Sequence, residues 1–316
     1  MTWTALTSPS QLELAAQRGD FLLTAEVAPP KGGDPTHMLD QAATLRDRVH
    51  AVNVTDSSRA MARMSPLAAA ALLETIGLES VMQLACRDRN RIALQGDLMG
   101  AVALGIRNVL ALTGDPVKLG DYKSARQVSD LEAVRLLRLI RNLKAGTDAN
   151  DKVLPDGPVK LFAGAAVDPQ LPNINALKRR CERKIQNGAH FFQSQMITDF
   201  DRLDVFMDKV ARPMGTPVLA GIFLLKSAKN AQFINKYIPG VKIPDSTIDR
   251  LGAATDPLLE GVDIAAEQVK IARELCDGVH LMAVKAEHLI PKILDRAGIL
   301  PLIDQEVPSS FTPLTP

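Results

Sequence analysis

The stretch from Ser80 to Asp115, SVMQLACRDRNRIALQGDLMGAVALGIRNVLALTGD, decides the fold class of this protein. It begins and ends with short apolar runs, SVMQLAC and NVLALTG, which predict strands that are buried on both faces. The segment between them has helical length and stops at Gly105, a natural helix end. The stretch therefore predicts a strand, a helix and a second strand in succession.

Similar runs of apolar and β-branched residues recur about every thirty residues along the chain. There are eight: FLLTAEV from Phe21, AVNVTD from Ala51, SVMQLAC from Ser80, NVLALTG from Asn108, KLFAGAAV from Lys160, FFQSQM from Phe191, PVLAGIF from Pro217 and GVHLMAV from Gly278. Eight strand–helix units without a break in composition predict a single (β/α)8 TIM barrel over residues 1–302. An open doubly wound sheet is the alternative, but no G-x-G-x-x-G motif follows the first run.

Two shorter segments carry their own predictions. Ser129 followed by Glu132 predicts a capping box at the start of the helix that precedes the fifth run. Residues 303–316 include the proline-rich run EVPSSFTPLTP, which has no periodicity. This composition predicts an extended or disordered C-terminal tail.

The composition favours a soluble, cytoplasmic protein with a small-molecule partner. Apolar residues make up 46% of the 316 residues, enough for a large core. The net charge of +1 gives no overall attraction to nucleic acid or to an anionic membrane. No apolar run has the length of a membrane helix, and the first residues lack the layout of a signal peptide. The three widely spaced cysteines, Cys86, Cys181 and Cys276, suit a reducing compartment.

Metal and serine-nucleophile chemistry find no support in the sequence. The five histidines include no i, i+4 pair, so we expect no metal site. The G-x-S-x-G motif of serine hydrolases is absent. Cys86 follows an apolar strand and is expected to be part of the core.

Polar residues that follow the strands are the candidates for an active site, because a (β/α)8 barrel builds its site at the C-terminal ends of its strands. Those positions hold Glu26, Thr55-Asp56, Arg87-Asp88, Thr113-Gly114-Asp115, Gln195 and Lys226-Ser227. Glu26 is the most informative, because a carboxylate within an apolar strand is costly to bury unless it is paired or used. Burial would keep a proton on Glu26 near neutral pH, which suits a general acid. The alternative is a structural ion pair with a basic residue of a neighbouring strand.

Two other strand ends suit the binding of a flat, polar ligand. In Thr113-Gly114-Asp115, a residue without a side chain precedes an acid, so that a ligand can approach the backbone closely. The alternative there is an ordinary turn. Gln195 offers a donor and an acceptor together, as the edge of a heterocycle requires, or it is a buried amide satisfied by the backbone.

Eight segments, in order along the chain, resemble the methylenetetrahydrofolate reductase family, most closely its short bacterial form of one-carbon and acetyl-CoA metabolism. They are TAEVAPPKGGDP, AVNVTD, RMSPLAAAALL, ESVMQLACRDRNRIALQGDLMGA, LGIRNVLALTGDPVKLGD, GAAVDP, ERKIQNGAHFFQSQ and LAGIFLLKSAKNAQFINKYIPGVKIPD. The resemblance implies a barrel with FAD on its C-terminal face. It also implies hydride transfer from the flavin to 5,10-methylenetetrahydrofolate, which gives 5-methyltetrahydrofolate.

The resemblance implies roles for individual residues. Glu26 matches the acid that protonates the folate, and Asp115 matches an aspartate whose charge favours the developing cation. Gln195, Asp115, Lys226 and Ser227 are implied in folate binding. The positions implied in FAD binding are Thr55, Gln83, Thr113, Gly114, Asp115, Val128, Ala166 and Lys184.

Some positions depart from the better-known members of the family. Gln83 stands in place of a histidine, Thr113 in place of an arginine, and Ala166 in place of a tyrosine. The loop Lys226-Ser227-Ala228 lacks the aromatic residue that stacks on folate or nicotinamide. The electron donor is therefore either NAD(P)H or a partner protein, and in the second case the chain is a flavin- and folate-binding subunit of a complex. A related pterin or a deazaflavin is a third alternative, and a homo-oligomer is the default expectation.

Overall fold

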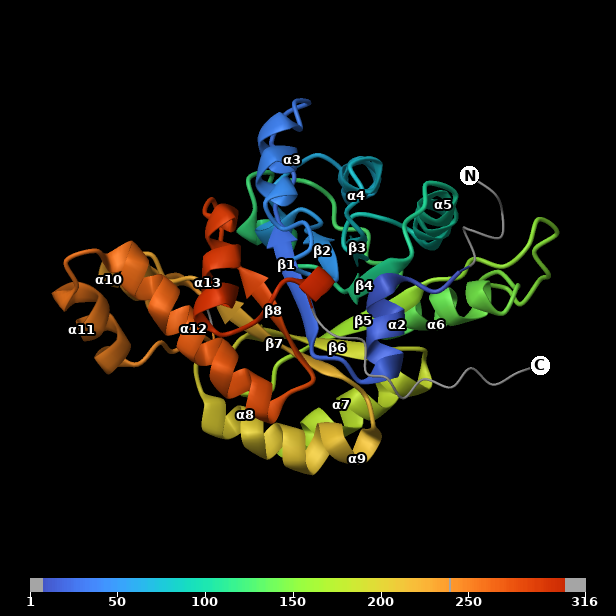
Figure 1. Ribbon diagram of the computed structural model, residues 1–316. Coiled ribbons are helices and arrows are strands. Elements are labelled where there is room, and N and C mark those ends of the chain that lie inside the picture. The colour runs from blue at the N-terminus through green and yellow to red at the C-terminus, as the bar shows by residue number, and fades with distance from the viewer. Residues whose placement is uncertain (1–7, 239, 305–316) are drawn as a thin grey trace.

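The computed structural model describes residues 8–238 and 240–304, and in them the chain forms a closed barrel of eight parallel strands, as predicted (Figure 1). Each strand pairs with the next along the chain, and β8 pairs with β1. One strand lies within each of the eight sequence runs: β1 (Leu22–Val27), β2 (Ala51–Val54), β3 (Ser80–Ala85), β4 (Asn108–Leu112), β5 (Phe162–Val167), β6 (Phe191–Met196), β7 (Val218–Phe223) and β8 (Gly278–Met282).

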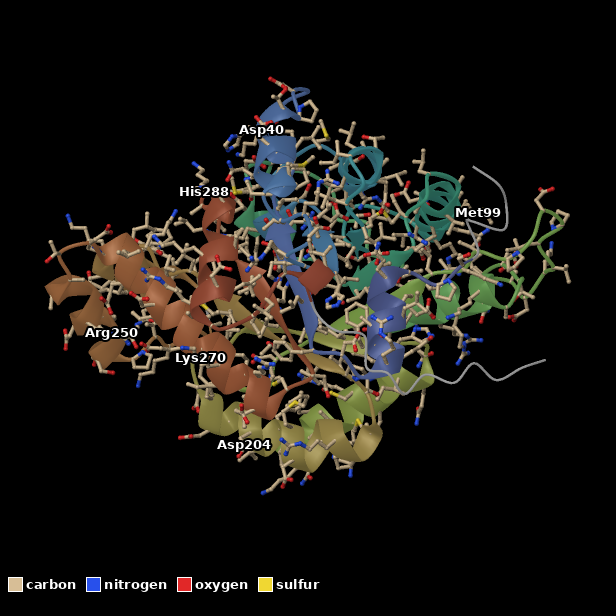
Figure 2. The ribbon with its side chains drawn as sticks, in the orientation of Figure 1. Asp40, Met99, Asp204, Arg250, Lys270 and His288 are labelled. Carbon is tan, nitrogen blue, oxygen red and sulfur yellow. The ribbon has the colours of Figure 1, made fainter. Side chains whose placement is uncertain are left out.

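Helices surround the strands, and their outer faces carry exposed charged side chains such as Asp204, Arg250 and Lys270 (Figure 2). The helices are α2 (Gln11–Arg18), α3 (Thr36–Ala43), α4 (Pro66–Thr75), α5 (Arg91–Ala103), α6 (Ala133–Lys144), α7 (Ile174–Gln186), α8 (Phe200–Phe206), α9 (Arg212–Met214), α10 (Ala228–Tyr237), α11 (Asp245–Ala253), α12 (Pro257–Leu275) and α13 (Ile290–Arg296). Shorter turns are η1 (Ser58–Ala60), η2 (Val117–Leu119), η3 (Met207–Ala211), η4 (Glu287–Leu289) and η5 (Leu302–Asp304). Within the described residues, no helix is both long and apolar enough to cross a membrane.

The lower layer of the barrel interior, at the N-terminal ends of the strands, is apolar. Leu22, Ala51, Val81, Leu110, Phe162, Phe191 and Leu219 form one buried cluster with Leu12 and Ala15 of α2. Phe162 and Phe191 stack with their ring centroids 5.1 Å apart. A Cβ atom at Gly164 would lie 2.2 Å from the ring of Phe191, so the glycine makes room for this ring. Large side chains therefore fill this end of the barrel.

Helix α2 covers the same end and is attached by the carboxylate of Glu79. Its oxygens accept the backbone N–H groups of Gln11 at 2.6 Å and Leu12 at 3.0 Å, and the side-chain amide of Asn108 at 2.9 Å. The hydroxyl of Ser10 donates to the amide oxygen of Asn108 at 2.6 Å. A negative charge at the first turn of a helix is favourable, which explains how Glu79 is accommodated although it is buried.

The middle layer of the interior is polar. Side chains alternate along a strand, so the residues two positions beyond the lower layer also face inward. Five of these are buried polar residues: Thr24, Asn53, Gln83, Gln193 and His280. Among the described residues, the side-chain amide of Asn53, Oε1 of Gln193 and Nε2 of His280 have no hydrogen-bond partner. Buried polar atoms of this kind are commonly satisfied by buried water.

The predicted capping box is wrong. Helix α6 begins at Ala133, and Glu132, its N-cap residue, makes no capping hydrogen bond with its side chain. The backbone N–H of Ser129 donates to the carbonyl of Arg87 at 3.3 Å, and Ser129 has a left-handed φ of 44°. The hydroxyl of Thr113 instead accepts the N–H of Ala133 at 3.2 Å. The hydrogen bond between Thr113 and Ala133 therefore takes the place of the predicted capping box.

The turn η5 (Leu302–Asp304) spans the predicted boundary between barrel and tail, and residues 305–316 of the predicted tail lie outside the described residues. The cysteines are free and buried, and Cys86 is part of the main core, as predicted. Burial raises the pKa of Cys86 to about 12. This thiol therefore stays protonated near neutral pH.

His50, which precedes β2, makes the stability of the fold depend on pH. Its Nδ1 accepts the backbone N–H of Leu23 at 3.0 Å, and burial lowers its pKa from 6.5 to about 4. Between these two values the unfolded chain binds a proton that the folded chain excludes. The contribution of neutral His50 is therefore complete above about pH 6.5 and is lost as the pH falls to about 4.

Replacing His50 with asparagine should remove this dependence, because the amide oxygen replaces Nδ1 as the acceptor but does not titrate. Urea unfolding of parent and variant should be measured across this pH range. The free energy of unfolding of the parent, relative to His50→Asn, should fall by up to about 3 kcal/mol towards acid pH. A difference that stays constant with pH would contradict the assignment.

Candidate active site

A pocket of about 350 Å³ opens at the C-terminal ends of β3 to β6. Seven of the predicted site residues line it: Gln83, Thr113, Gly114, Asp115, Ala166, Lys184 and Gln195. The remaining lining residues are Asp56, Ser58, Ala85, Arg87, Ala111, Leu112 and Ala133. The structure thus brings residues of β3 to β6, of the loops that follow them and of the loop after β2 to one place.

Glu26 lies at the margin of this pocket, near the end of β1. Its Oε2 accepts a hydrogen bond from Nε2 of Gln83, a pocket residue, at 3.3 Å. The same oxygen lies 3.6 Å from Nε2 of His280 on β8, and the side chain of Glu26 is 22% exposed. Among the described residues, the basic side chain within 4 Å of this carboxyl is therefore a histidine of a neighbouring strand rather than a lysine or arginine.

Gly114 is required by the turn after β4. Its φ is 90°, and a Cβ atom there would lie 2.9 Å from Cβ of Arg87. The turn and its packing on the β3 loop therefore explain this glycine. Asp115 follows, and its Oδ2 accepts the backbone N–H of Arg59 in η1 at 2.7 Å. This bond ties the loop after β4 to the loop after β2.

No role could be assigned from the sequence to Asp56 and Arg87, two charged residues that line the pocket. Asp56 is buried, and its Oδ2 accepts the N–H of Ala85 at 2.8 Å and Nη1 of Arg89 at 2.7 Å. Arg87 is also buried and pairs with Asp88 at 2.5 Å. Their position directly after strands two and three could have identified them as pocket residues. The Asp56–Arg89 and Arg87–Asp88 ion pairs therefore stabilise this wall of the pocket.

A bulge in β6 places Gln195. The register between β6 and β7 shifts between Gln193 and Met196. Ser194 stabilises the irregularity, because its hydroxyl accepts the N–H of Gly221 at 2.7 Å and donates to the carbonyl of Gln195 at 2.7 Å. A Cβ atom at Gly221 would lie 2.6 Å from this carbonyl, so only glycine fits beside the bulge. Bulges re-aim side chains beside active sites, and here the exposed Gln195 lines the pocket.

Lys184 brings a positive charge to the pocket from α7. Its Nζ donates to the carbonyl of Ala166 at 2.5 Å. Burial lowers the pKa of this lysine, and in the described part of the chain no carboxylate pairs with it. A half-buried cation without a counter-ion favours an anionic ligand.

Besides Glu26 at its margin, four predicted residues do not line this pocket. Thr55 is buried next to Asp56, and its hydroxyl has no partner among the described residues. Val128 is exposed, and its N–H donates to the carbonyl of Arg87 at 2.9 Å. In the loop after β7, Lys226 donates to the carbonyl of Val284 at 3.1 Å, and Ser227 caps α10. The loop after β7 is therefore held by contacts with the segment after β8 and with α10, and Lys226 and Ser227 do not line the pocket.

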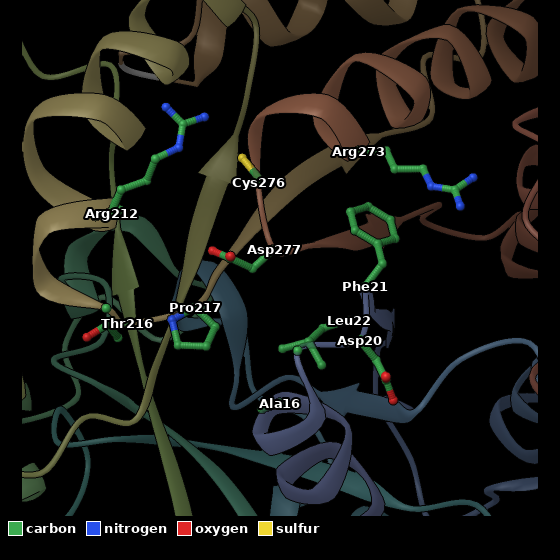
Figure 3. Close-up of a pocket in the computed structure, with 13 residues that line it drawn as sticks. Ala16, Asp20, Phe21, Leu22, Arg212, Thr216, Pro217, Arg273, Cys276 and Asp277 are labelled. Atoms are coloured by element: carbon green, nitrogen blue, oxygen red, sulfur yellow. The ribbon is translucent and has the colours of Figure 1, made fainter. Parts of the chain in front are cut away.

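A second pocket, of about 580 Å³, lies at the opposite end of the barrel (Figure 3). Its lining includes Leu22, Pro217, Cys276 and Asp277, beside the starts of β1, β7 and β8. Asp277 accepts the N–H of Val218 at 2.9 Å, a contact that supports the strands. Residues at this end of a (β/α)8 barrel serve stability rather than chemistry. The candidate site is therefore the pocket of about 350 Å³ at the C-terminal ends of the strands.

Relatives with known names match this chain at low identity. A 5,10-methylenetetrahydrofolate reductase of Pectobacterium carotovorum subsp. carotovorum is 24% identical over 91% of this chain and 94% of its own length. Methylenetetrahydrofolate reductase 1 of Schizosaccharomyces pombe is 28% identical over 72% of this chain. The chain spans only 38% of the length of that yeast relative and 34% of that of a Caenorhabditis elegans relative.

Among solved structures, a Clostridium thermocellum protein that binds two copies of 5-methyl-5,6,7,8-tetrahydrofolic acid resembles this chain with a TM-score of 0.57. The two are 12% identical, and the likeness covers 89% of this chain and 98% of the other, which supports the fold. A sequence model of methylenetetrahydrofolate reductase matches residues 11–298. This match covers nearly the whole barrel, so the chain belongs to the methylenetetrahydrofolate reductase family.

Proposed function

We propose that this protein is a methylenetetrahydrofolate reductase, which converts 5,10-methylenetetrahydrofolate to 5-methyltetrahydrofolate with FAD as its cofactor. The observation that carries the proposal is the convergence of Gln83, Asp115, Lys184 and Gln195 on one pocket, with Glu26 at its margin. The family match and the folate bound by the Clostridium thermocellum protein support the substrate.

The residues at the pocket fit a flavin dinucleotide. The uncompensated charge of Lys184 suits a phosphate, and the small side chain of Ala166 leaves space beside it. The unpaired hydroxyl of Thr55 offers a further polar contact at the end of β2. We therefore assign these residues, with Gln83, Thr113, Gly114, Asp115 and Val128, to FAD binding. Bound, reduced FAD supplies the hydride that the one-carbon unit accepts.

Glu26 donates the proton that the reaction needs. The five-membered ring of the folate opens when one of its nitrogens is protonated, which leaves a reactive iminium. The carboxyl of Glu26 is the acidic group at the pocket margin that contacts a pocket amide, Gln83, and no basic side chain other than His280 among the described residues. It therefore serves as the general acid.

Asp115 and Gln195 orient and stabilise the substrate. The backbone N–H of Arg59 holds the carboxylate of Asp115 at the pocket edge, where its negative charge favours a developing cation. Gln195 presents an amide donor and acceptor to the edge of the pterin. In this proposal, Lys226 and Ser227 contact only the outer part of the folate, since they lie outside the pocket.

The electron donor has two candidates. The loop after β7 presents Lys226, Ser227 and Ala228 instead of an aromatic side chain. The nearby aromatic residues Phe233 and Tyr237 lie on α10 and pack on each other, with 4.7 Å between ring centroids. No aromatic platform for nicotinamide comes from this loop, which favours a partner protein over NAD(P)H as the donor.

Replacing Glu26 with glutamine should leave FAD bound but slow the reduction of methylenetetrahydrofolate by about a hundredfold or more, because the general acid is lost. Stopped-flow reoxidation of the reduced enzyme by the folate measures this step. Glu274→Gln, which alters an exposed carboxylate of α12, is the matched control and should react like the parent. Equal rates for Glu26→Gln and the parent would refute the assigned role.

Replacing Lys184 with glutamine should weaken FAD binding about tenfold to a hundredfold, the effect of losing one charge-assisted contact. The affinity of the parent should fall as alkaline pH removes the proton of Lys184, earlier than for an ordinary lysine because its pKa is lowered. The variant should not show this fall. Fluorescence titration with FAD measures both effects, and the exposed Lys178→Gln on the same helix is the control.

An absorption spectrum under anaerobic conditions tests the donor. The protein as purified should show a flavin spectrum that 5-methyltetrahydrofolate bleaches but NADH and NADPH do not. Rapid bleaching by a nicotinamide would show that the chain needs no partner protein. The absence of any flavin, bound or loadable, would overturn the proposed function itself.

A further inference from the structure

His280 makes a contact with Glu26 that the proposed mechanism does not yet use. The imidazole is 1% exposed and faces the interior of the barrel from β8. Its Nδ1 lies 3.0 Å from Oγ1 of Thr24, and its Nε2 lies 3.6 Å from Oε2 of Glu26. Nε2 has no hydrogen-bond partner among the described residues. One ring nitrogen is thus anchored, and the other is aimed at the carboxyl.

The register of the barrel fixes this arrangement. β8 pairs with β1 so that His280 lies beside Thr24, and Glu26 is the next inward-facing residue of β1. Gly278 lets the two strands meet, because a Cβ atom there would lie 2.3 Å from the carbonyl oxygen of Leu22. The strand register therefore fixes the backbone of His280 beside Thr24, and Oγ1 of Thr24 holds the ring at Nδ1.

The contact suits both protonation states of Glu26. When the hydroxyl of Thr24 donates to Nδ1, the proton of the neutral ring is on Nε2 and points at a carboxylate. When Nδ1–H donates to Thr24, the lone pair of Nε2 faces a protonated carboxyl. In either state, the contact between Nε2 and Oε2 is favourable at the 3.6 Å that separates them.

The surroundings of the pair are polar but uncharged. The neighbouring inward-facing residues Asn53, Gln83 and Gln193 are amides. Asn53 and Gln193 keep unpaired polar atoms in a space where buried water is the usual partner. Within the described chain, no other charged side chain forms an ion pair with Glu26 or His280. Among the described residues, the side chains in polar contact with the carboxyl of Glu26 are therefore those of His280 and Gln83.

We propose that His280 is a positioning residue for Glu26: its Nε2 holds the carboxyl at the pocket margin by a close polar contact, while Thr24 fixes the ring. The catalytic meaning of this contact rests on the proposed function. The contact itself does not, and a spectroscopic measurement tests it separately.

Two substitutions at His280 separate the two ring contacts. Asparagine places its amide near the position of Nδ1, so it keeps Thr24 as a partner but no longer reaches Glu26. Glutamine reaches the position of Nε2 and keeps the contact with Glu26. His280→Asn should lower kcat about tenfold to a hundredfold with little change in the KM for the folate, the cost of a misplaced catalytic group. His280→Gln should retain most of the kcat. A parent-like kcat for His280→Asn, or equal losses in both variants, would overturn the proposal.

Nitrogen NMR of histidine-labelled protein provides the second readout. The ring signal of His280, identified by its absence in His280→Asn, should shift when Glu26 is replaced by glutamine. Asp115→Asn is the matched control, because it removes a carboxylate from the same face without touching His280, and it should leave the signal in place. An unchanged signal in Glu26→Gln rules the contact between His280 and Glu26 out. If the signal shifts but the parent does not reduce the folate, the proposed function fails while the contact between His280 and Glu26 stands.

Discussion

The pairing of β8 with β1 is the constraint on which the candidate site depends. It joins residues 256 positions apart in the sequence and places Thr24, Glu26 and His280 in one line of contacts. Its register requires a glycine at position 278, where any Cβ would collide with β1. Since Glu26 also reaches Gln83 on β3, closure of the barrel links the last strand to the pocket through a single carboxylate.

The barrel interior changes from apolar to polar along the barrel axis. The lower layer is apolar and aromatic, and α2 packs onto it, so burial of this layer stabilises the fold. The middle layer is polar, and some of its atoms have no protein hydrogen-bond partner among the described residues. The pocket lies beyond this layer, at the strand ends.

The strands and most of the pocket could be predicted from the sequence. Apolar runs at regular spacing identify strands that are buried on both faces, and the fold then assigns polar residues such as Asp115 and Gln195 to one end. His280 was missed because the histidines were considered only as metal ligands. Its place within an apolar strand was a usable signal, but its proximity to Glu26 depends on the β1–β8 register, which no local pattern contains. The bulge at Gln195 and the cap supplied by Thr113 arise in the same way from neighbouring strands and loops.

Helix α2 closes the N-terminal end of the barrel. Its attachment through Glu79 and the aromatic layer above it fill this end of the barrel with side chains. A ligand of the candidate site therefore enters and leaves on the side of the barrel opposite α2.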